Sequence, residues 1–171
     1  MLFARSVAEA HLFMDLRGAE PGPRNHALVA RGDDLVATYR ANVDGVEQRF
    51  EFDIPEPMPR GGMFGGPEPS RIIGPAEFLA HADAIASTVP GSAAGLSPAQ
   101  KNEASRRLNV ALACLDEVMK FIPPGQDSVP DGAFLSDADR ALRAKEPGRY
   151  SRVRLLAVAG AYRGLVQQFN A

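Results

Sequence analysis

The feature that most constrains the fold is a change in hydrophobic period on either side of residues 61–73, a segment rich in glycine and proline. Before this segment apolar and polar residues alternate, as in half-buried strands, whereas after it apolar residues recur at helical spacing. Glycine reaches backbone angles closed to other residues, and proline fixes φ and lacks an N–H donor. Because neither regular element continues through such a mixture, we expect residues 61–73 to form a shaped connector between a β-rich part and a helical part.

The part before the connector is predicted to form four strands. The first is assigned to residues 10–16, where apolar residues stand at every second position. Ser6 and Glu9 have the spacing of a capping box, which predicts a single helical turn ahead of this strand. The other three strands are expected at residues 26–30, 35–40 and 46–54. Turns at residues 18–23, 32–34 and 42–45 keep the connections short, which favours an antiparallel meander with one buried face.

The part after the connector is predicted to form three to four helices. Proline is well placed at the first position of a helix, where its missing N–H would have no partner anyway. The helices are expected at residues 75–89, 98–122 and 137–145 and from residue 147 onward. Leu112 lies in the middle of the apolar stripe of the longest helix and is expected in the core. Small residues beside the stripe of the last helix indicate two neighbouring helices: Ala157, Gly160, Ala161 and Gly164.

These patterns predict an α+β fold with a four-stranded antiparallel β-meander followed by three to four packed α-helices. A chain of 171 residues that is 45% hydrophobic fits a single domain, residues 1–171. Within it we distinguish a β-rich half at residues 1–60, the connector at residues 61–73, and a helical half at residues 74–171.

Composition argues against several classes of protein. A net charge of -2 does not suit a protein that coats nucleic acid. A single cysteine excludes an internal disulfide framework and a cysteine-rich metal site, and it fits a reducing cytoplasm. No apolar run is long enough to span a bilayer, and the first residues lack the pattern of a signal peptide. We therefore expect a cytoplasmic protein without membrane association, metal or cofactor.

Three blocks of the sequence carry a resemblance to a known group of proteins: residues 8–16, residues 64–73, and residues 146–150 with their continuation at 157–163. On these blocks the chain resembles a family of small uncharacterised proteins of actinomycete-type bacteria. The resemblance implies an N-terminal zinc-ribbon-like hairpin unit and a C-terminal helical half. It also implies that cysteine pairs occupy two turns in the relatives, whereas the corresponding residues here, 17–22 and 41–45, include no cysteine. Some proteins of this kind look like companions of toxin or conflict systems.

The connector is the first candidate for a binding surface. Phe64 is apolar and is expected to anchor the connector on a core. The polar side chains of Glu68, Ser70 and Arg71 are then expected to be exposed on the connector. A loop of fixed shape anchored on a rigid scaffold is a common place for binding residues.

A basic patch in the helical half is the second candidate for a binding surface. Its central residues are Arg149 and Arg152, which lie close together in the sequence with acidic residues nearby. A solvated surface explains such a patch, and an acidic protein partner is the functional alternative. The scarcity of aromatic residues and the absence of tryptophan count against nucleic acid as the partner.

An enzymatic site is the alternative interpretation of the front half. His11 and Asp15 share one face of the predicted first strand, so His11 is a candidate base or ligand oriented by its neighbours. Together with Glu68 and Arg71 they form the candidate set for a small enzyme. A sheet face under a helix, with His11 held by a hydrogen bond, explains the same pattern, and a catalytic role requires a mutual geometry that a sequence does not show.

The remaining motifs indicate no site. The glycines of the connector are not followed by the Lys-Ser/Thr pair of a phosphate loop, and Pro67 and Pro69 remove amide donors from it. His26 and His81 lack the tight spacing of zinc ligands. Cys114 falls at the edge of an apolar helical stripe, where we expect it to fill the core.

The sequence therefore predicts a non-enzymatic protein-binding module, in the manner of an immunity or accessory protein of a bacterial toxin or conflict system. Its expected partner is another protein, of which a toxin is one kind. One alternative is a small enzyme with a site between the strand that carries His11 and Asp15 and residues 68–71. The other alternative is a degenerate zinc-ribbon protein associated with nucleic acid.

Overall fold

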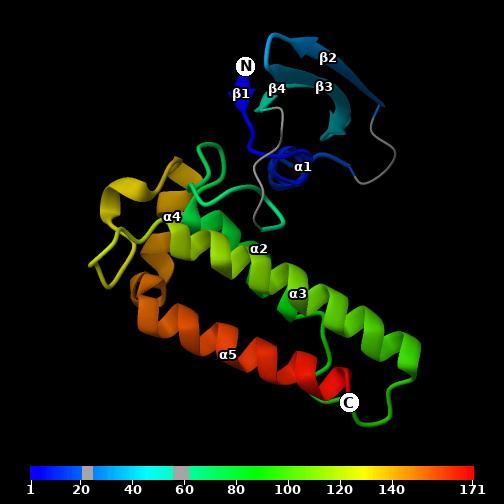
Figure 1. Ribbon diagram of the computed structural model, residues 1–171, viewed down its shortest axis with the longest axis vertical. Helices are drawn as coiled ribbons and strands as arrows, with labels where there is room; N and C mark the ends of the chain where they lie inside the picture. Colours follow the sequence, from blue (N-terminus) through cyan, green and yellow to red (C-terminus); the bar gives the residue numbers. More distant parts are fainter. Residues whose placement is uncertain (21–24, 56–61) are drawn as a thin grey trace. The chain divides into compact units, whose positions relative to one another are not determined.

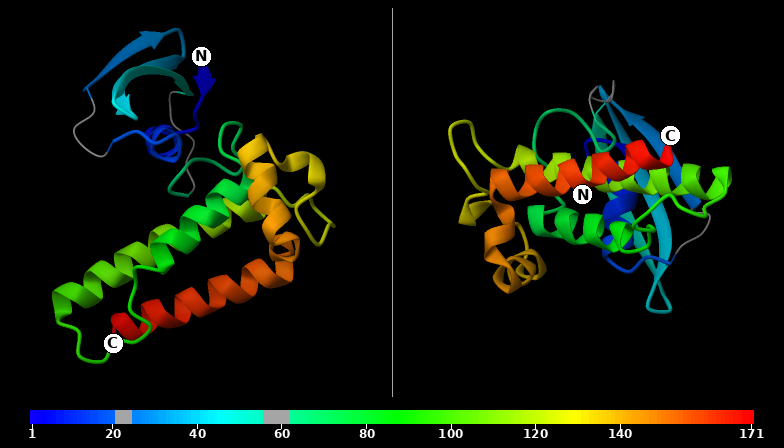
Figure 2. Two further views of the ribbon diagram at one scale, coloured as in Figure 1. Left: turned by 180° about the vertical axis from the view of Figure 1, so that it is seen from behind. Right: turned by 90° about the horizontal axis from the view of Figure 1, so that it is seen from below.

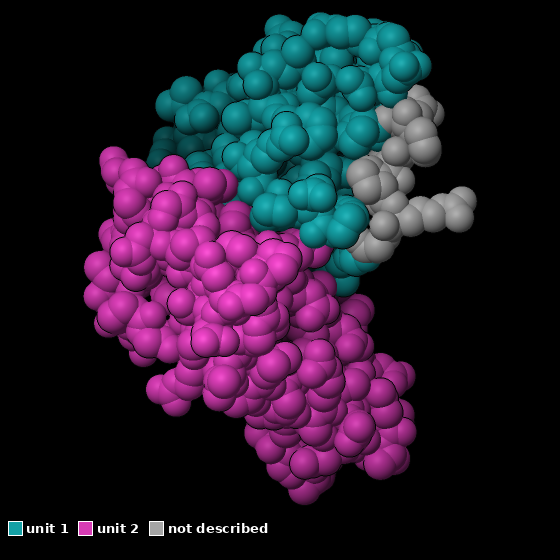
Figure 3. Space-filling model, turned by 60° about the vertical axis from the view of Figure 1, so that its left-hand side comes forward, with its two compact units in different colours: residues 1–73 teal, residues 74–171 magenta. Residues whose placement is uncertain are grey.

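The computed structural model describes residues 1–20, 25–55 and 62–171, and these form an α+β structure, as predicted. Part of the turn predicted at 18–23 and the first residue of the connector lie outside the described residues. The chain divides into two compact units, Met1–Ile73 and Gly74–Ala171, which Figure 3 colours separately. The connector thus belongs to the first unit, and the second unit begins where the helical half was expected.

The first unit contains a mixed four-stranded sheet with the order β1-β4-β3-β2. Its strands are β1 (Leu2–Phe3), β2 (Asn25–Arg31), β3 (Asp34–Val43) and β4 (Val46–Pro55). The pairs β2–β3 and β3–β4 are antiparallel, whereas β1 runs parallel to β4. The prediction of an all-antiparallel four-stranded meander is therefore wrong. The second, third and fourth predicted strands exist as β2, β3 and β4, and the remaining strand comes from the first residues of the chain.

The two hairpins follow from local turn chemistry. The β3–β4 turn is Asp44-Gly45, and both residues have positive φ, 52° and 80°. That combination matches a type I′ turn, whose twist fits the flanking strands. In the β2–β3 turn only Gly32 has positive φ, 63°, as the first residue of a type II′ turn requires.

The strand predicted at residues 10–16 is instead a helix, α1 (Val7–Leu16). Ser6 caps it by accepting a hydrogen bond from the Glu9 N–H at 3.1 Å, so the predicted helical turn is real but continues. Ala10, Phe13 and Met14 are all buried, and their spacing is that of one helical face. The alternation of apolar residues in this segment concealed that spacing, and its alanine, leucine and methionine favour helix.

α1 packs against one face of the sheet (Figure 1). The rings of Phe13 and Phe52 meet edge to face with centroids 5.8 Å apart. His11 and Tyr39 meet in the same way at 5.2 Å. These contacts place the core of the first unit between α1 and the face of β3 and β4 that carries Tyr39 and Phe52.

The second unit consists of α-helices joined by loops and two short 3₁₀ helices. The elements are α2 (Pro75–Ala86), α3 (Pro98–Lys120), η1 (Asp131–Ala133), α4 (Asp137–Lys145), η2 (Pro147–Tyr150) and α5 (Arg152–Phe169). The predicted starts at residues 75, 98 and 137 are confirmed. Pro147 opens η2 rather than the last helix, because Ser151 accepts the Arg154 N–H and starts α5 there.

α3 is the centre of the second unit, since both α2 and α5 pack along it (Figures 1 and 2). Leu108 and Leu115 are each 1% exposed, and Leu108 packs against Phe169 of α5. Leu112 is only half-buried, so its predicted place in the middle of the core is wrong. The buried face of α3 is rotated toward Cys114, which is fully buried as expected.

Among the described residues, the two glycines of α5 do not lie against a second helix. A side chain added at Gly160 or Gly164 would meet nothing within 4 Å. Val153 and Leu156 of the same helix are 77% and 50% exposed. Gly160 and Gly164 therefore face open space, whereas Ala157 lines a hollow with Leu79 of α2. The main packing of α5 is against α3.

Replacement of Leu108 by alanine tests the central role of α3. Leu108→Ala is expected to lower the free energy of unfolding by about 2–5 kcal/mol, because it leaves a cavity at a fully buried site. The control Leu112→Ala is expected to cost less than half as much, because that side chain is partly solvated. Urea unfolding monitored by circular dichroism measures both, and equal losses would contradict the assigned orientation of α3.

Candidate functional site

The structure buries one of the three polar side chains that the sequence predicted to be exposed on the connector. Phe64 is buried as expected, and its carbonyl accepts a hydrogen bond from the Ser6 hydroxyl at 3.1 Å. Ser70 is also buried, and its Oγ accepts the N–H groups of Ile72 and Ile73 at 3.2 and 3.0 Å. The expectation that Ser70 is displayed is therefore wrong, because its hydroxyl stabilises the turn that follows it.

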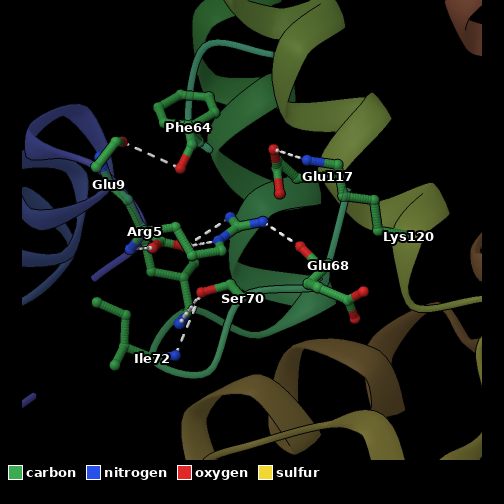
Figure 4. Close-up of polar contacts among 10 residues, drawn as sticks. Arg5, Glu9, Phe64, Glu68, Ser70, Ile72, Glu117 and Lys120 are labelled. Carbon is green, nitrogen blue, oxygen red and sulfur yellow. Dashed lines mark hydrogen bonds and ion pairs between the residues drawn. The ribbon is translucent and has the colours of Figure 1, made fainter. Parts of the chain in front are cut away.

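A buried ion pair holds the connector in place. The Glu9 carboxylate accepts Nε and Nη2 of Arg5 on Oε1 at 2.9 and 2.6 Å, and the Arg5 backbone N–H on Oε2 at 2.6 Å. Arg5 also donates from Nη1 to the carbonyl of Glu68, so one guanidinium joins α1 to the connector (Figure 4). Arg5 is 4% exposed and Glu9 is not exposed. Charged hydrogen bonds of this kind are strong and fix geometry.

The glycine at position 65 is required by this ion pair. Gly65 has φ of +140°, and a Cβ there would lie 2.6 Å from the Cβ of Arg5. Any side chain would thus displace Arg5 or the connector. The charged side chains of Glu68 and Arg71 remain exposed on this fixed backbone, and the Arg71 guanidinium stacks over the ring of Phe3 at 5.0 Å.

Loss of the Glu9 carboxylate tests this arrangement. Glu9→Ala is expected to lower the free energy of unfolding by about 3–5 kcal/mol, because it leaves the Arg5 charge buried without its counter-ion. The double variant Arg5→Met/Glu9→Leu is expected to be more stable than Glu9→Ala, because it removes both charges. Chemical denaturation of wild type, Glu9→Ala and the double variant measures the three free energies of unfolding. If Glu9→Ala lowers this free energy by less than about 1 kcal/mol, the Arg5–Glu9 pair is solvated.

The residues proposed for an enzymatic site have different described neighbours. His11 and Asp15 share a face of α1 rather than of a strand, and His11 is half-buried against Tyr39 whereas Asp15 is exposed. Arg71 lies over Phe3 of β1. Two hollows on this unit are lined by other residues: one by Met1, Leu2, Arg49, Phe50 and Glu51, the other by Arg40, Ala41, Asn42, Gly45 and Glu47.

The basic patch of the second unit is largely occupied by contacts within that unit. Arg149 binds Asp83 of α2 through Nη1 and Nη2 at 2.5 and 2.9 Å, and Glu146 at 3.2 Å. The hydrogen bonds that Arg149 donates to the Asp83 carboxylate raise the pKa of Arg149 above its already high value. Arg152 donates from Nη2 to the carbonyl of Gln126 at 3.3 Å. Arg149 thus braces η2 against α2, and Arg152 links the start of α5 to the loop that carries Gln126.

Asp139 is an internal anchor that the sequence reading missed. Its Oδ1 accepts the N–H groups of Ala76 and Glu77 at 2.7 and 3.0 Å, and its Oδ2 accepts that of Leu135 at 2.9 Å. Asp139 is fully buried, and burial raises its pKa although these N–H groups act in the opposite direction. A Cβ at Gly74 would lie 1.9 Å from Oδ2. The available signal was the Gly74-Pro75 start of α2, which has no capping side chain of its own.

A pair of aspartate variants on α4 tests this anchor. Asp139→Ala is expected to lower the free energy of unfolding by at least about 2 kcal/mol, because it leaves three buried N–H groups without an acceptor. Asp137→Ala is the matched control, because its side chain on the same helix is exposed and it is expected to change stability by less than about 0.5 kcal/mol. Thermal and urea unfolding measure both, and similar values for the two variants would contradict the anchoring role.

The open edge of β2 carries backbone polar groups for which the described sheet supplies no partner strand. β2 ends the strand order and pairs with β3. Residues 27–31 are all exposed, including Leu28 at 51% and Val29 at 61%. An edge strand that is long and apolar is a template for pairing with another chain.

The register shows which groups of β2 point outward. Arg31 and Asp34 flank the two-residue β2–β3 turn, so they form a hydrogen-bonded pair. Such pairs alternate with non-hydrogen-bonded ones, so Val29 and Ala27 direct their backbone groups to β3. Leu28 and Ala30 therefore direct their N–H and C=O groups to the open edge.

Three further features concern a metal site, a reactive cysteine and a membrane-spanning helix. Among the described residues, no group of three or more His, Cys, Asp or Glu is placed to hold a metal ion. Burial, followed by the nearby charge of Glu117, raises the pKa of Cys114 to about 12, so its thiol stays protonated at neutral pH. No helix in residues 1–20, 25–55 and 62–171 combines the length and apolarity needed to cross a bilayer.

Comparison of the chain with protein families, curated proteins and solved structures finds no match. The resemblance to an actinomycete-type family therefore stays a prediction.

Proposed function

We propose that the protein is a non-enzymatic protein-binding module that pairs with a strand of its partner along the open edge of β2. The observation that supports this proposal is the exposure of Leu28 and Val29 on a seven-residue edge strand. Strand addition uses the backbone groups of such an edge for affinity and the neighbouring side chains for specificity.

The composition of β2 favours this role over a passive edge. Proteins protect edge strands with charges, prolines, bulges or very short length. In β2 the central run of residues 27–30 is Ala-Leu-Val-Ala, and its ladder with β3 is continuous from Asn25 to Arg31. Neither charge nor irregularity therefore protects the centre of β2.

The other candidate surfaces support binding less strongly. Ser70 and the Phe64 carbonyl are engaged within the connector, and Arg149 is engaged by Asp83. Glu68 and Arg71 remain exposed and are proposed as a secondary contact. By the resemblance noted above, the partner is proposed to be a component of a bacterial toxin or conflict system, for which this protein would act as an immunity or accessory protein.

A capture experiment with matched edge variants tests the proposal. Leu28→Lys places a charge on the edge, and Ala30→Pro removes an outward N–H without touching the β2–β3 ladder. Val46→Lys is the control, because Val46 is 62% exposed but lies at the start of β4, away from the edge. Wild type and Val46→Lys are expected to capture the same proteins from the native host, and both edge variants to lose them by at least about tenfold.

Folding of each variant is checked by its thermal unfolding midpoint before capture. Quantitative mass spectrometry then measures the captured proteins. Equal capture by folded Leu28→Lys and by wild type would contradict the β2 edge as the binding surface.

A further inference from the structure

We infer that the strand which the β2 edge accepts is β2 of a second copy of this chain, antiparallel to it about a two-fold axis at Leu28. This inference rests on the proposed use of the β2 edge for strand pairing. It deepens that proposal by naming the strand that occupies the edge in the isolated protein, where the strand of a host partner would have to replace it.

The backbone of β2 is complementary to itself in this register. Leu28 and Ala30 direct their N–H and C=O groups outward, and by the same alternation so does the backbone of residue 26. A two-fold axis at Leu28 sets this residue opposite Leu28 of the second copy, and Ala30 opposite residue 26. Every one of these is a hydrogen-bonded pair, so the outward groups of both strands find partners in one register.

The side chains of β2 also suit a second copy. Leu28 pairs with Ala37 of β3, so it lies on the face of the sheet that packs against α1. Pairing sets Leu28 against Leu28 of the second copy and so extends the apolar face across the junction. On the opposite face Val29 stands beside Ala27 of the second copy. Arg31 falls opposite the uncharged Asn25, so no like charges oppose each other.

The sheet order limits this assembly to two copies. Once the β2 edges are joined, the free edges of the combined sheet are β1 and the part of β4 that β1 does not cover, residues 46–51. β1 contains only two residues, Leu2–Phe3, which is too short to template another long strand. The uncovered part of β4 carries the charged side chains of Glu47, Arg49 and Glu51, which protect an edge from pairing. The two-fold interface uses the same patch on both copies and therefore closes on itself. A seven-residue strand pair is a small interface, so we expect a dissociation constant in roughly the micromolar range.

The oligomeric state of the purified protein gives the first test. Sedimentation velocity over roughly 5–500 µM is expected to show a monomer–dimer equilibrium for wild type and for Val46→Lys. Leu28→Lys is expected to weaken the dimer at least about tenfold, because it opposes two like charges at the axis. A wild-type protein that stays monomeric over this range, or a dimer unaffected by Leu28→Lys, would overturn the inference.

A disulfide experiment tests the register. Ala27 faces Val29 of the second copy in a non-hydrogen-bonded pair, where Cα atoms are about 4.5 Å apart and a disulfide can form. Mixing Ala27→Cys with Val29→Cys is expected to give a disulfide-linked heterodimer, whereas either variant alone places its cysteines about two residues out of register. Cys114 is buried and present in every sample, so wild type is the background control. Equal cross-linking by a single variant would place the axis elsewhere.

These tests separate this inference from the proposed function. If the protein is monomeric but Leu28→Lys still loses a captured host protein, the inferred dimer is contradicted. The proposal that the β2 edge binds a host partner is then supported. A dimer with the expected register would support pairing with a second copy. If the edge variants then captured host proteins as well as wild type does, the proposal that a host partner binds the β2 edge would be contradicted.

Discussion

The buried ion pair of Arg5 and Glu9 is the interaction on which the first unit depends. Removing two charges from water costs several kcal/mol for each ion unless good geometry and further hydrogen bonds offset the cost. Here Glu9 accepts three N–H groups from Arg5, and Arg5 also reaches the Glu68 carbonyl. These contacts require the start of α1 and the connector to be together. The shape of the connector is therefore a consequence of this pair, and Gly65 provides the space for it.

The second unit uses a buried carboxylate in a similar way. Asp139 of α4 accepts the N–H groups of Ala76 and Glu77 at the start of α2. In both units a charged side chain satisfies backbone groups of a segment about sixty residues distant in the sequence. Such contacts convert polar residues that look available in the sequence into internal supports. The backbone of the β2 edge has no comparable support within the described residues, which is why it stands out as a binding surface.

Sequence reasoning identified part of the candidate surface. Glu68 and Arg71 are exposed on a fixed connector, as predicted. The burial of Ser70 was missed although its hydrogen bonds to Ile72 and Ile73 are local turn contacts. The engagement of Arg149 by Asp83 was not predictable, because it depends on how the chain folds back. The edge position of β2 was also not predictable from the pattern, because residues 10–16, predicted as the preceding strand of the meander, form α1, and β1 joins the other end of the sheet.

The sequence by itself determined the features that local chemistry controls. Asp44-Gly45 specified a tight hairpin, and Ser97-Pro98 and Ser136 specified helix starts, because turns and caps involve residues within four positions of each other. The tertiary structure alone decided whether residues 10–16 became helix or strand, since both periods fit that apolar segment and packing against Phe52 selected the helix. It also decided the parallel partner of β1 and the open side of α5. Those features depend on which apolar faces meet, and a pattern along one chain does not specify the pairing of faces distant in sequence.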